Sequence, residues 1–271
     1  MSCKMFVSDL DGTLLDNDHK ISNENIEAIQ ALEEKSIKFI VATGRTKYML
    51  EDYLDSVNYE GPFIWSNGAA ISDTTGKVLL SKKLAVEDSK QLMDLAHEYK
   101  VDFVVYTLDG IVAEEEKGRM ERLARYNESV KKEHRIPLTI DPMLYDNLHN
   151  YPVIKFSFSS KDSEALHQFQ GVVNEKVEAI NGVFSHPILL DVTRKDATKG
   201  EAVLELAKHY KIDPKEIAAI GDNQNDVSML EVCGISITLE NAVESAKQVA
   251  KHITKDNHSS GVAHAIKEYI L

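Results

Sequence analysis

The segment KMFVSDLDGTLLD, residues 4–16, decides how this chain is interpreted. Apolar residues suited to a buried strand lead directly into Asp9 and Asp11, two carboxylates separated by one residue. The next residues, Gly12 and Thr13, indicate a turn. Ionised carboxylates are costly to hold beside a buried strand unless another group pairs with them. The segment therefore indicates a site at the end of a core strand, where a partner neutralises the two carboxylates.

The composition is that of a soluble globular protein with one large domain or two smaller ones in its 271 residues. The chain carries 31 basic and 44 acidic residues, which gives a net charge of -13. Such a surface repels nucleic acid and anionic membranes, so we expect neither as a partner. An anionic substrate would need a locally positive pocket, built from a few basic residues or a metal.

The cysteine content bears on the expected compartment. The two cysteines, Cys3 and Cys233, are far apart in the sequence and belong to no CxxC pair. We therefore expect no disulfide framework and a reducing environment. The N-terminus lacks the apolar core of a signal peptide, and no apolar run approaches the roughly 20 residues of a membrane span. These features together predict a cytoplasmic protein.

Strand-like and helix-like segments alternate at both ends of the chain. Residues 37–43, IKFIVAT, form an almost continuous apolar run, which is typical of a parallel strand covered on both faces. The middle of the chain differs, because VIKFSFS at residues 153–159 alternates like a half-exposed antiparallel strand. We therefore predict an α/β domain with a mainly parallel sheet, formed by residues 1–83 and 190–271, and an inserted α+β domain at residues 84–189.

Four short polar motifs share one predicted position, just after a strand or at the start of a helix. They are DLDGT at residues 9–13, TGR at 43–45, TKG at 198–200 and GDNQND at 221–226. Ligands collect at the carboxyl ends of strands in open α/β sheets. We therefore expect the four motifs to meet at one edge of the sheet.

The charges of these motifs favour a site for a metal and a phosphate. Asp9, Asp11, Asp222 and Asp226 would bring four carboxylates together, and like charges at close range require a counter-ion. Oxygen ligands of this kind favour Mg²⁺, which commonly binds one or two carboxylates, waters and substrate phosphate. Lys199 adds a compact positive charge beside them.

The same set of groups suits covalent phosphoryl transfer. Thr43 and Gly44, at a strand end, could donate a hydroxyl and a backbone N–H to an anion. A carboxylate in such a site can attack phosphorus and form an aspartyl phosphate. A second carboxylate two residues further on could protonate the leaving oxygen and later activate water.

Together the motifs resemble those of the haloacid dehalogenase superfamily of phosphohydrolases, specifically its Cof-type branch. That family carries DxDGT, a strand ending in S/TGR, a lysine that opens a helix, and GDxxND, in this order. SNGA at residues 66–69 and Asn241 also fall where the branch has such residues. The resemblance covers the whole chain and implies a Rossmann-like core with an α/β cap domain in the inserted block. The matched residues are Asp9, Asp11, Gly12, Thr13, Thr43, Gly44, Arg45, Lys199, Gly221, Asp222, Asn225 and Asp226.

The resemblance implies a role for each matched residue. Asp9 would be the nucleophile and a Mg²⁺ ligand. Asp11 would be the general acid and base, with its backbone carbonyl on the metal. Asp222 would be the third protein ligand of Mg²⁺, and Asp226 would orient Lys199 or a metal-bound water. The residues expected to bind the phosphoryl group are Leu10 through its backbone, Thr43, Gly44, Lys199 and Asn225.

Two features are left open by the sequence. Arg45 could contact the substrate or pair with a carboxylate of the cap. The loop before Lys199 also departs from relatives that read DVTPKG, because here it contains Arg194, Lys195 and Asp196. That difference does not touch the matched set, but it argues against assuming a relative's substrate.

The function expected from the resemblance is a Mg²⁺-dependent phosphomonoesterase acting on small phosphorylated metabolites. Sugar phosphates are the commonest substrates of the family, with FMN and pyridoxal phosphate as further candidates. Two alternatives remain open: a phosphomutase that uses the same aspartyl phosphate, and a non-catalytic sensor of phosphorylated metabolites. Each motif alone is weak, and their joint occurrence in the right order favours an enzyme. We expect a monomer or a small homo-oligomer.

Overall fold

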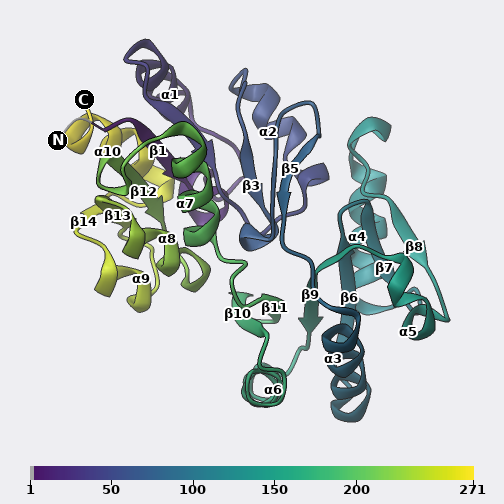
Figure 1. Ribbon diagram of the computed structural model, residues 1–271. Coiled ribbons are helices and arrows are strands. Elements are labelled where there is room, and N and C mark those ends of the chain that lie inside the picture. The colour runs from purple at the N-terminus through teal and green to yellow at the C-terminus, as the bar shows by residue number, and fades with distance from the viewer. Residues whose placement is uncertain (1–2) are drawn as a thin grey trace. The chain divides into compact units, whose positions relative to one another are not determined.

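The computed structural model describes residues 3–271, which form two compact units (Figure 1). The first unit consists of the chain up to Arg45 together with Asp52–Leu80 and Thr198–Leu271. The second consists of Thr46–Glu51 and Ser81–Ala197. Segments from both ends of the chain thus share the first unit, and the middle of the chain makes most of the second.

The first unit is built on a five-stranded parallel sheet. Its strands lie in the order β14 (His252–Thr254), β13 (Ile235–Leu239), β12 (Ile217–Gly221), β1 (Met5–Ser8) and β2 (Lys38–Val41). Met5 of β1 is opposite Ile217 on one side and Lys38 on the other. All four residues of β1 are buried, as expected for a parallel strand covered on both faces.

Helices and a small second sheet complete this part of the chain. Helices α7 (Lys199–Tyr210) and α8 (Val227–Val232) supply Val203 and Leu230 to a core shared with Val7 of β1. Helix α1 (Asn23–Glu34) packs against α10 (Gly261–Tyr269). The other elements are α2 (Glu51–Ser56), α9 (Glu244–Val249), and the three-stranded sheet β3 (Phe63–Trp65), β4 (Ala70–Ser72) and β5 (Val78–Ser81).

The second unit contains a six-stranded sheet in which one neighbouring pair is parallel and the others are antiparallel. Its core lies where Leu92 and Phe169 of two helices meet Phe156 and Phe158 of the sheet. The sheet order is β10 (Ile180–His186), β11 (Leu189–Arg194), β9 (Val153–Ser159), β6 (Asp102–Thr107), β7 (Gly110–Ala113) and β8 (Leu138–Ile140). The helices are α3 (Val86–Tyr99), α4 (Gly118–Ser129), α5 (Leu144–Asn147) and α6 (Ser163–Lys176).

Strand β9 is buried along its whole length, so the prediction of a half-exposed strand was wrong. Phe156 and Phe158 face the apolar core, as the alternation predicts. The polar face is also covered, because Lys155 pairs with Asp191 of β11 at 3.0 Å and its Nζ lies 4.2 Å from the centre of the Tyr106 ring. A paired lysine can be buried, and a sequence pattern alone does not reveal its partner.

Among the helices of residues 3–271, none combines the length and the apolar composition needed to cross a bilayer.

Candidate active site

Three of the predicted site residues, Asp9, Asp222 and Asp226, meet at the carboxyl ends of β1 and β12. Asp9 extends the pairing of β1, because its N–H donates to the Ile220 carbonyl at 2.9 Å. One carboxylate oxygen from each of Asp9, Asp222 and Asp226 lies within 4.8 Å of the other two. Residues far apart in the sequence thus form one acidic cluster, because neighbouring parallel strands end at the same edge of the sheet.

Lys199 supplies a positive charge to this cluster. Its Nζ lies 2.5 Å from Oδ1 of Asp9 and 2.6 Å from Oδ1 of Asp226, and all three side chains are buried. Although burial disfavours its charged form, the charges of Asp226 and Asp9 raise the pKa of Lys199. Lys199 opens helix α7, whose start is capped by the Thr198 hydroxyl. The lysine is therefore fixed as an ammonium between two carboxylates.

Asp226 also shapes the loop that carries Asp222. Its Oδ2 accepts hydrogen bonds from the backbone N–H groups of Asp222, at 3.0 Å, and Asn223, at 2.9 Å. A Cβ at Gly221 would lie 2.5 Å from the Asp226 carboxyl carbon, so a side chain there would collide with it. One buried carboxylate therefore joins the loop to Lys199.

Asp222 is held on its other side by the turn after β1. The hydroxyl of Thr13 donates to Oδ1 of Asp222 at 2.7 Å. Gly12 has a φ of +78°, and a Cβ at Gly12 would lie 2.7 Å from Oδ2 of Asp222. Glycine suits this position because the backbone is left-handed and the carboxylate is close.

The electrostatics of the cluster indicate an excess of negative charge. Burial, and then the charge of Asp226, raise the pKa of Asp9 well above its usual range. The same two causes raise the pKa of Asp222 to about 7. One lysine therefore does not compensate three carboxylates, and a cation would relieve the remainder. Carboxylate oxygens are the donors that Mg²⁺ prefers, so the residues present fit this ion.

Asp11 lies apart from this buried cluster and pairs with Arg45. The guanidinium donates from Nε to Oδ2 of Asp11 at 2.7 Å and from Nη2 to Oδ1 at 2.5 Å. Nη1 donates to the Tyr53 hydroxyl at 3.1 Å, and the guanidinium also lies over the Tyr53 ring. The Asp11 side chain is 44% exposed and that of Arg45 is 15% exposed. The sequence leaves Arg45 open between a substrate contact and a cap carboxylate, and in the structure its guanidinium pairs with Asp11.

The remaining predicted residues lie in the same unit. Leu10 and Thr43 are buried, and the Thr43 hydroxyl accepts a hydrogen bond from the backbone N–H of Arg45 at 3.1 Å. Nδ2 of Asn225 donates to Oδ1 of Asn67 at 2.9 Å. The side chain of Asn67 lies next to Gly44, because a Cβ on Gly44 would be 2.8 Å from Oδ1 of Asn67.

Two asparagines join the site although the sequence assigned them no role. Asn67 contacts Asn225 as described above. Asn241 donates from Nδ2 to the Gly12 carbonyl at 2.9 Å and accepts from the Asn257 N–H at 3.1 Å. The SNGA motif and Asn241 were the available signals, but their partners lie far away in the sequence.

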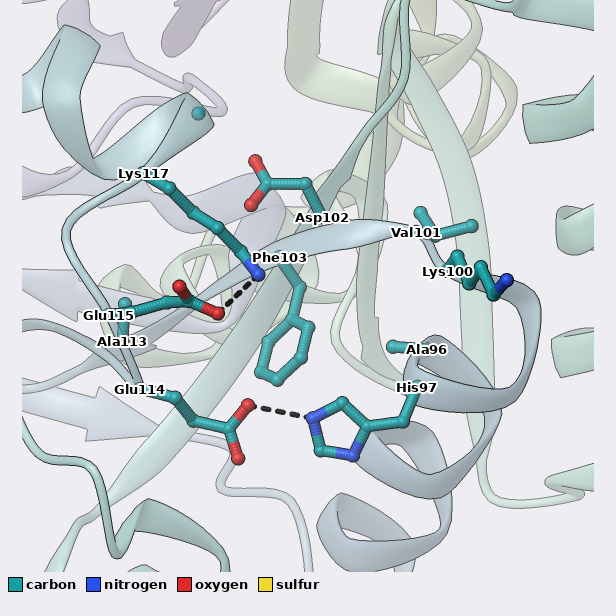
Figure 2. Close-up of a pocket in the computed structure, with 11 residues that line it drawn as sticks. Ala96, His97, Lys100, Val101, Asp102, Phe103, Ala113, Glu114, Glu115 and Lys117 are labelled. Carbon is teal, nitrogen blue, oxygen red and sulfur yellow. Dashed lines mark hydrogen bonds and ion pairs between the residues drawn. The ribbon is translucent and has the colours of Figure 1, made fainter.

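The second unit has a hollow of about 430 Å³ near the ends of α3 and β7 (Figure 2). Figure 2 shows the Phe103 ring beside the hydrogen bond between Glu114 and His97, with Glu115 paired to Lys117. The hydrogen bond between Glu114 and His97 is 2.7 Å long. These polar groups are satisfied by one another, and none of the predicted motif residues lines the hollow. The carboxylate cluster of the first unit is therefore the candidate active site.

The model for the haloacid dehalogenase-like hydrolase family matches residues 6–266 of this chain. The chain belongs to the haloacid dehalogenase-like hydrolases. This match confirms the predicted family. The parallel sheet together with the additional sheets, and the solved structure described below, confirm the predicted α/β fold class. The protein is a phosphatase of this family, a hydrolase that acts on phosphate monoesters.

Relatives of this hydrolase match it over almost their full length. It is 31% identical over 287 residues to the 5-amino-6-(5-phospho-D-ribitylamino)uracil phosphatase YwtE of Bacillus subtilis, with 98% of each chain covered. It is 24% identical over 273 residues to the pyridoxal phosphate phosphatase YbhA of Escherichia coli, with both chains fully covered. A solved haloacid dehalogenase-like hydrolase from B. subtilis superposes with a TM-score of 0.86 at 26% identity, covering 98% of this chain and 100% of that one.

Proposed function

We propose that this hydrolase is a Mg²⁺-dependent phosphomonoesterase that works through an aspartyl phosphate on Asp9. The observation that carries the proposal is the buried contact of Asp9 with Lys199, beside the carboxylates of Asp222 and Asp226. Small phosphorylated metabolites are the proposed substrates, with sugar phosphates first. Pyridoxal phosphate, FMN and the phosphoribityl substrate of the B. subtilis relative are the next candidates.

Asp9, Asp222 and the backbone carbonyl of Asp11 would hold the metal, which supplies positive charge to the carboxylates and to the phosphoryl oxygens. Lys199 holds Oδ1 of Asp9 and thereby fixes the orientation of the nucleophile. Asp226 in turn fixes Lys199 and shapes the loop that carries Asp222. Such positioning and charge neutralisation are the main tasks of a protein in phosphoryl transfer.

Two displacements at phosphorus complete the proposed reaction. A carboxylate oxygen of Asp9 forms a bond to phosphorus while the bond to the ester oxygen breaks, and Asp11 gives that oxygen a proton. Asp11 then removes a proton from water as the water oxygen attacks phosphorus. That attack releases inorganic phosphate and restores Asp9. Thr43, the Gly44 and Leu10 backbones, Lys199 and Asn225 are proposed to bind the phosphoryl oxygens.

We also propose a cap domain, a cellular compartment and an oligomeric state for this hydrolase. Residues 84–189 are proposed to form the cap that selects the leaving group, as the family resemblance implies. Cys3 and Cys233 are both free and buried, which supports a reducing, cytoplasmic setting. We propose a monomer or a small homo-oligomer.

Hydrolysis of p-nitrophenyl phosphate tests the proposed function. The assay compares Mg²⁺ with EDTA for the native chain, for Asp9→Asn, and for Asp18→Asn as a matched control on an exposed residue nearby. We expect metal-dependent turnover that Asp9→Asn abolishes and Asp18→Asn leaves intact. No turnover by the folded, Mg²⁺-loaded protein would contradict a general phosphatase. Turnover that needs a bisphosphorylated activator would instead indicate a mutase.

A further inference from the structure

A buried turn of unusual backbone geometry follows strand β3. Ser66, Asn67 and Gly68 have φ values of +49°, +59° and +92°, so three consecutive residues are left-handed. Ser66 and Asn67 are 0% and 3% exposed. Left-handed backbone is unfavourable for residues other than glycine, and it persists only where the surrounding contacts impose it. The contacts that impose this conformation should therefore indicate the role of the turn.

The turn is attached to the TGR motif by its backbone. The N–H of Asn67 donates to the Thr43 carbonyl at 3.0 Å, and the N–H of Ser66 donates to the Arg45 carbonyl at 2.9 Å. The Asn67 side chain lies over Gly44, where a Cβ would be 2.8 Å from Oδ1 of Asn67. Every residue of the TGR motif therefore contacts this turn.

The turn also contacts the start of α7, which carries the lysine of the site. A Cβ on Gly68 would lie 2.1 Å from the Thr198 carbonyl oxygen and 2.8 Å from the backbone nitrogen of Lys199. A side chain at residue 68 would collide with the helix start, so glycine is required for this close approach as well as for its positive φ.

The turn contacts the GDNQND loop as well as the TGR motif and the start of α7, and it does so through the Asn67 side chain. Its Oδ1 accepts a hydrogen bond from Nδ2 of Asn225 at 2.9 Å. Oδ1 of Asn225 is buried and has no hydrogen-bond partner in the described part of the chain. A primary amide is planar and has two N–H groups. With one N–H bound to Asn67, the direction of the second is set by the same contact.

We propose that Asn67 is a positioning residue of the phosphate site. It accepts one N–H of Asn225 and so directs the other N–H toward the phosphoryl group, while the left-handed turn holds Thr43, Gly44 and Lys199 in register. This inference rests on the proposed function, because it assigns Asn225 to phosphate binding. It goes beyond that function by adding a residue that touches none of the reacting atoms itself.

Asn67→Gly tests the inference without forcing a new backbone conformation. Glycine adopts a positive φ readily, so the turn keeps its shape while the acceptor for Asn225 is lost. Ser66→Gly is the matched control in the same turn, because the Ser66 hydroxyl has no hydrogen-bond partner among the described residues. Melting temperature reports stability, and the affinity for inorganic phosphate with Mg²⁺, measured by calorimetry, reports the site.

We expect Asn67→Gly to weaken phosphate binding and lower kcat/KM for p-nitrophenyl phosphate, each by about tenfold, as one orienting hydrogen bond is lost. Ser66→Gly should have the phosphate affinity and the kcat/KM of the native chain. Combining Asn67→Gly with Asn225→Ala should cost no more than Asn225→Ala alone, because both changes remove one interaction. A native phosphate affinity in Asn67→Gly, or additive losses in the double variant, would overturn the inference.

The calorimetric readout keeps this test separate from that of the proposed function. If the native chain binds phosphate but hydrolyses nothing, the phosphatase proposal fails while the role of Asn67 is still measured. If Asn67→Gly lowers only the melting temperature and leaves phosphate affinity unchanged, the residue is structural and the inference is wrong.

Discussion

Replacing Lys199 by methionine tests whether this lysine is the counter-charge of the acidic cluster. The side chain is 0% exposed and its Nζ lies 2.5 Å from Asp9 and 2.6 Å from Asp226. Methionine keeps much of the volume but leaves two buried carboxylates side by side. Removing one partner of a buried ion pair costs about 3–5 kcal/mol. For a domain of this size, that corresponds to a melting temperature lower by roughly 6–20 °C.

The sign of the pH dependence follows from Asp9. Its pKa is already raised by burial and by Asp226, and Lys199 is the group that lowers it. In Lys199→Met the pKa of Asp9 rises further above its unfolded value of about 3.9. A raised carboxylate pKa destabilises the fold most above the folded pKa, and the cost shrinks as pH falls below that pKa toward the unfolded value. The stability deficit of the variant should therefore shrink as pH is lowered from neutral toward the unfolded value of about 3.9.

Thermal unfolding with and without Mg²⁺ provides the assay. Mg²⁺ should recover part of the lost stability of Lys199→Met, because it adds positive charge beside the same carboxylates. Lys155→Met is the matched control, since it also breaks a buried pair, with Asp191 in the second unit. That control should lose stability without any rescue by Mg²⁺. A melting temperature of Lys199→Met equal to that of the native chain, or equal rescue of both variants, would show that Lys199 is not the counter-charge of the acidic cluster.

Three further predictions address the metal, the acid and the loop before α7. Burial and the charge of Asp226 raise the pKa of Asp222 to about 7, and a metal binds the ionised carboxylate. The rise in melting temperature caused by Mg²⁺ should therefore grow from about pH 6 to about pH 8. A rise that is independent of pH in thermal scans would contradict this. Asp11→Asn should lower kcat/KM for alkyl phosphates by about 10²–10⁴, and kcat/KM for p-nitrophenyl phosphate less, because nitrophenolate leaves without protonation and kcat/KM does not include the later attack of water. Arg45→Met should shift the ratio of the two kcat/KM values in the same direction. Equal losses of kcat/KM on both substrates would count against an acid role. The hydrogen bonds from Arg194 lower the pKa of Asp196 to about 2. The stability that Asp196 gives to the fold is therefore present above about pH 4 and is lost as pH falls toward 2. Since Asp196 is half exposed, Asp196→Asn should lower the free energy of unfolding by less than about 1 kcal/mol in denaturant titrations at neutral pH.

Local patterns in the sequence were enough to predict the parallel sheet of the first unit. The apolar runs at β1 and β2 predict parallel strands, and motifs at strand ends must meet at one edge of a parallel sheet. The motif positions therefore predict that Asp9, Lys199 and Asp222 lie together, and the structure brings them together. The prediction works because strand order and direction alone determine where these residues lie.

Long-range pairing of polar side chains could not be predicted in the same way. The alternation of β9 predicts an exposed face, but Asp191 and Tyr106 from neighbouring strands cover Lys155. The pairing of Arg45 with Asp11 joins two residues that are 34 positions apart in the sequence. The sequence names the residue types in each case, whereas the partner is decided by the packing of elements that are distant along the chain.

Trapping the phosphorylated protein tests the central claim most directly. The native chain is mixed with p-nitrophenyl phosphate and Mg²⁺, quenched within the first turnovers and treated with borohydride, which reduces an acyl phosphate to an alcohol. Peptide mass spectrometry then shows whether Asp9 has been converted to homoserine. We expect this conversion at Asp9 only, dependent on substrate and absent when Mg²⁺ is removed. Turnover with Asp9 unmodified, or with the modification at another carboxylate, would contradict it.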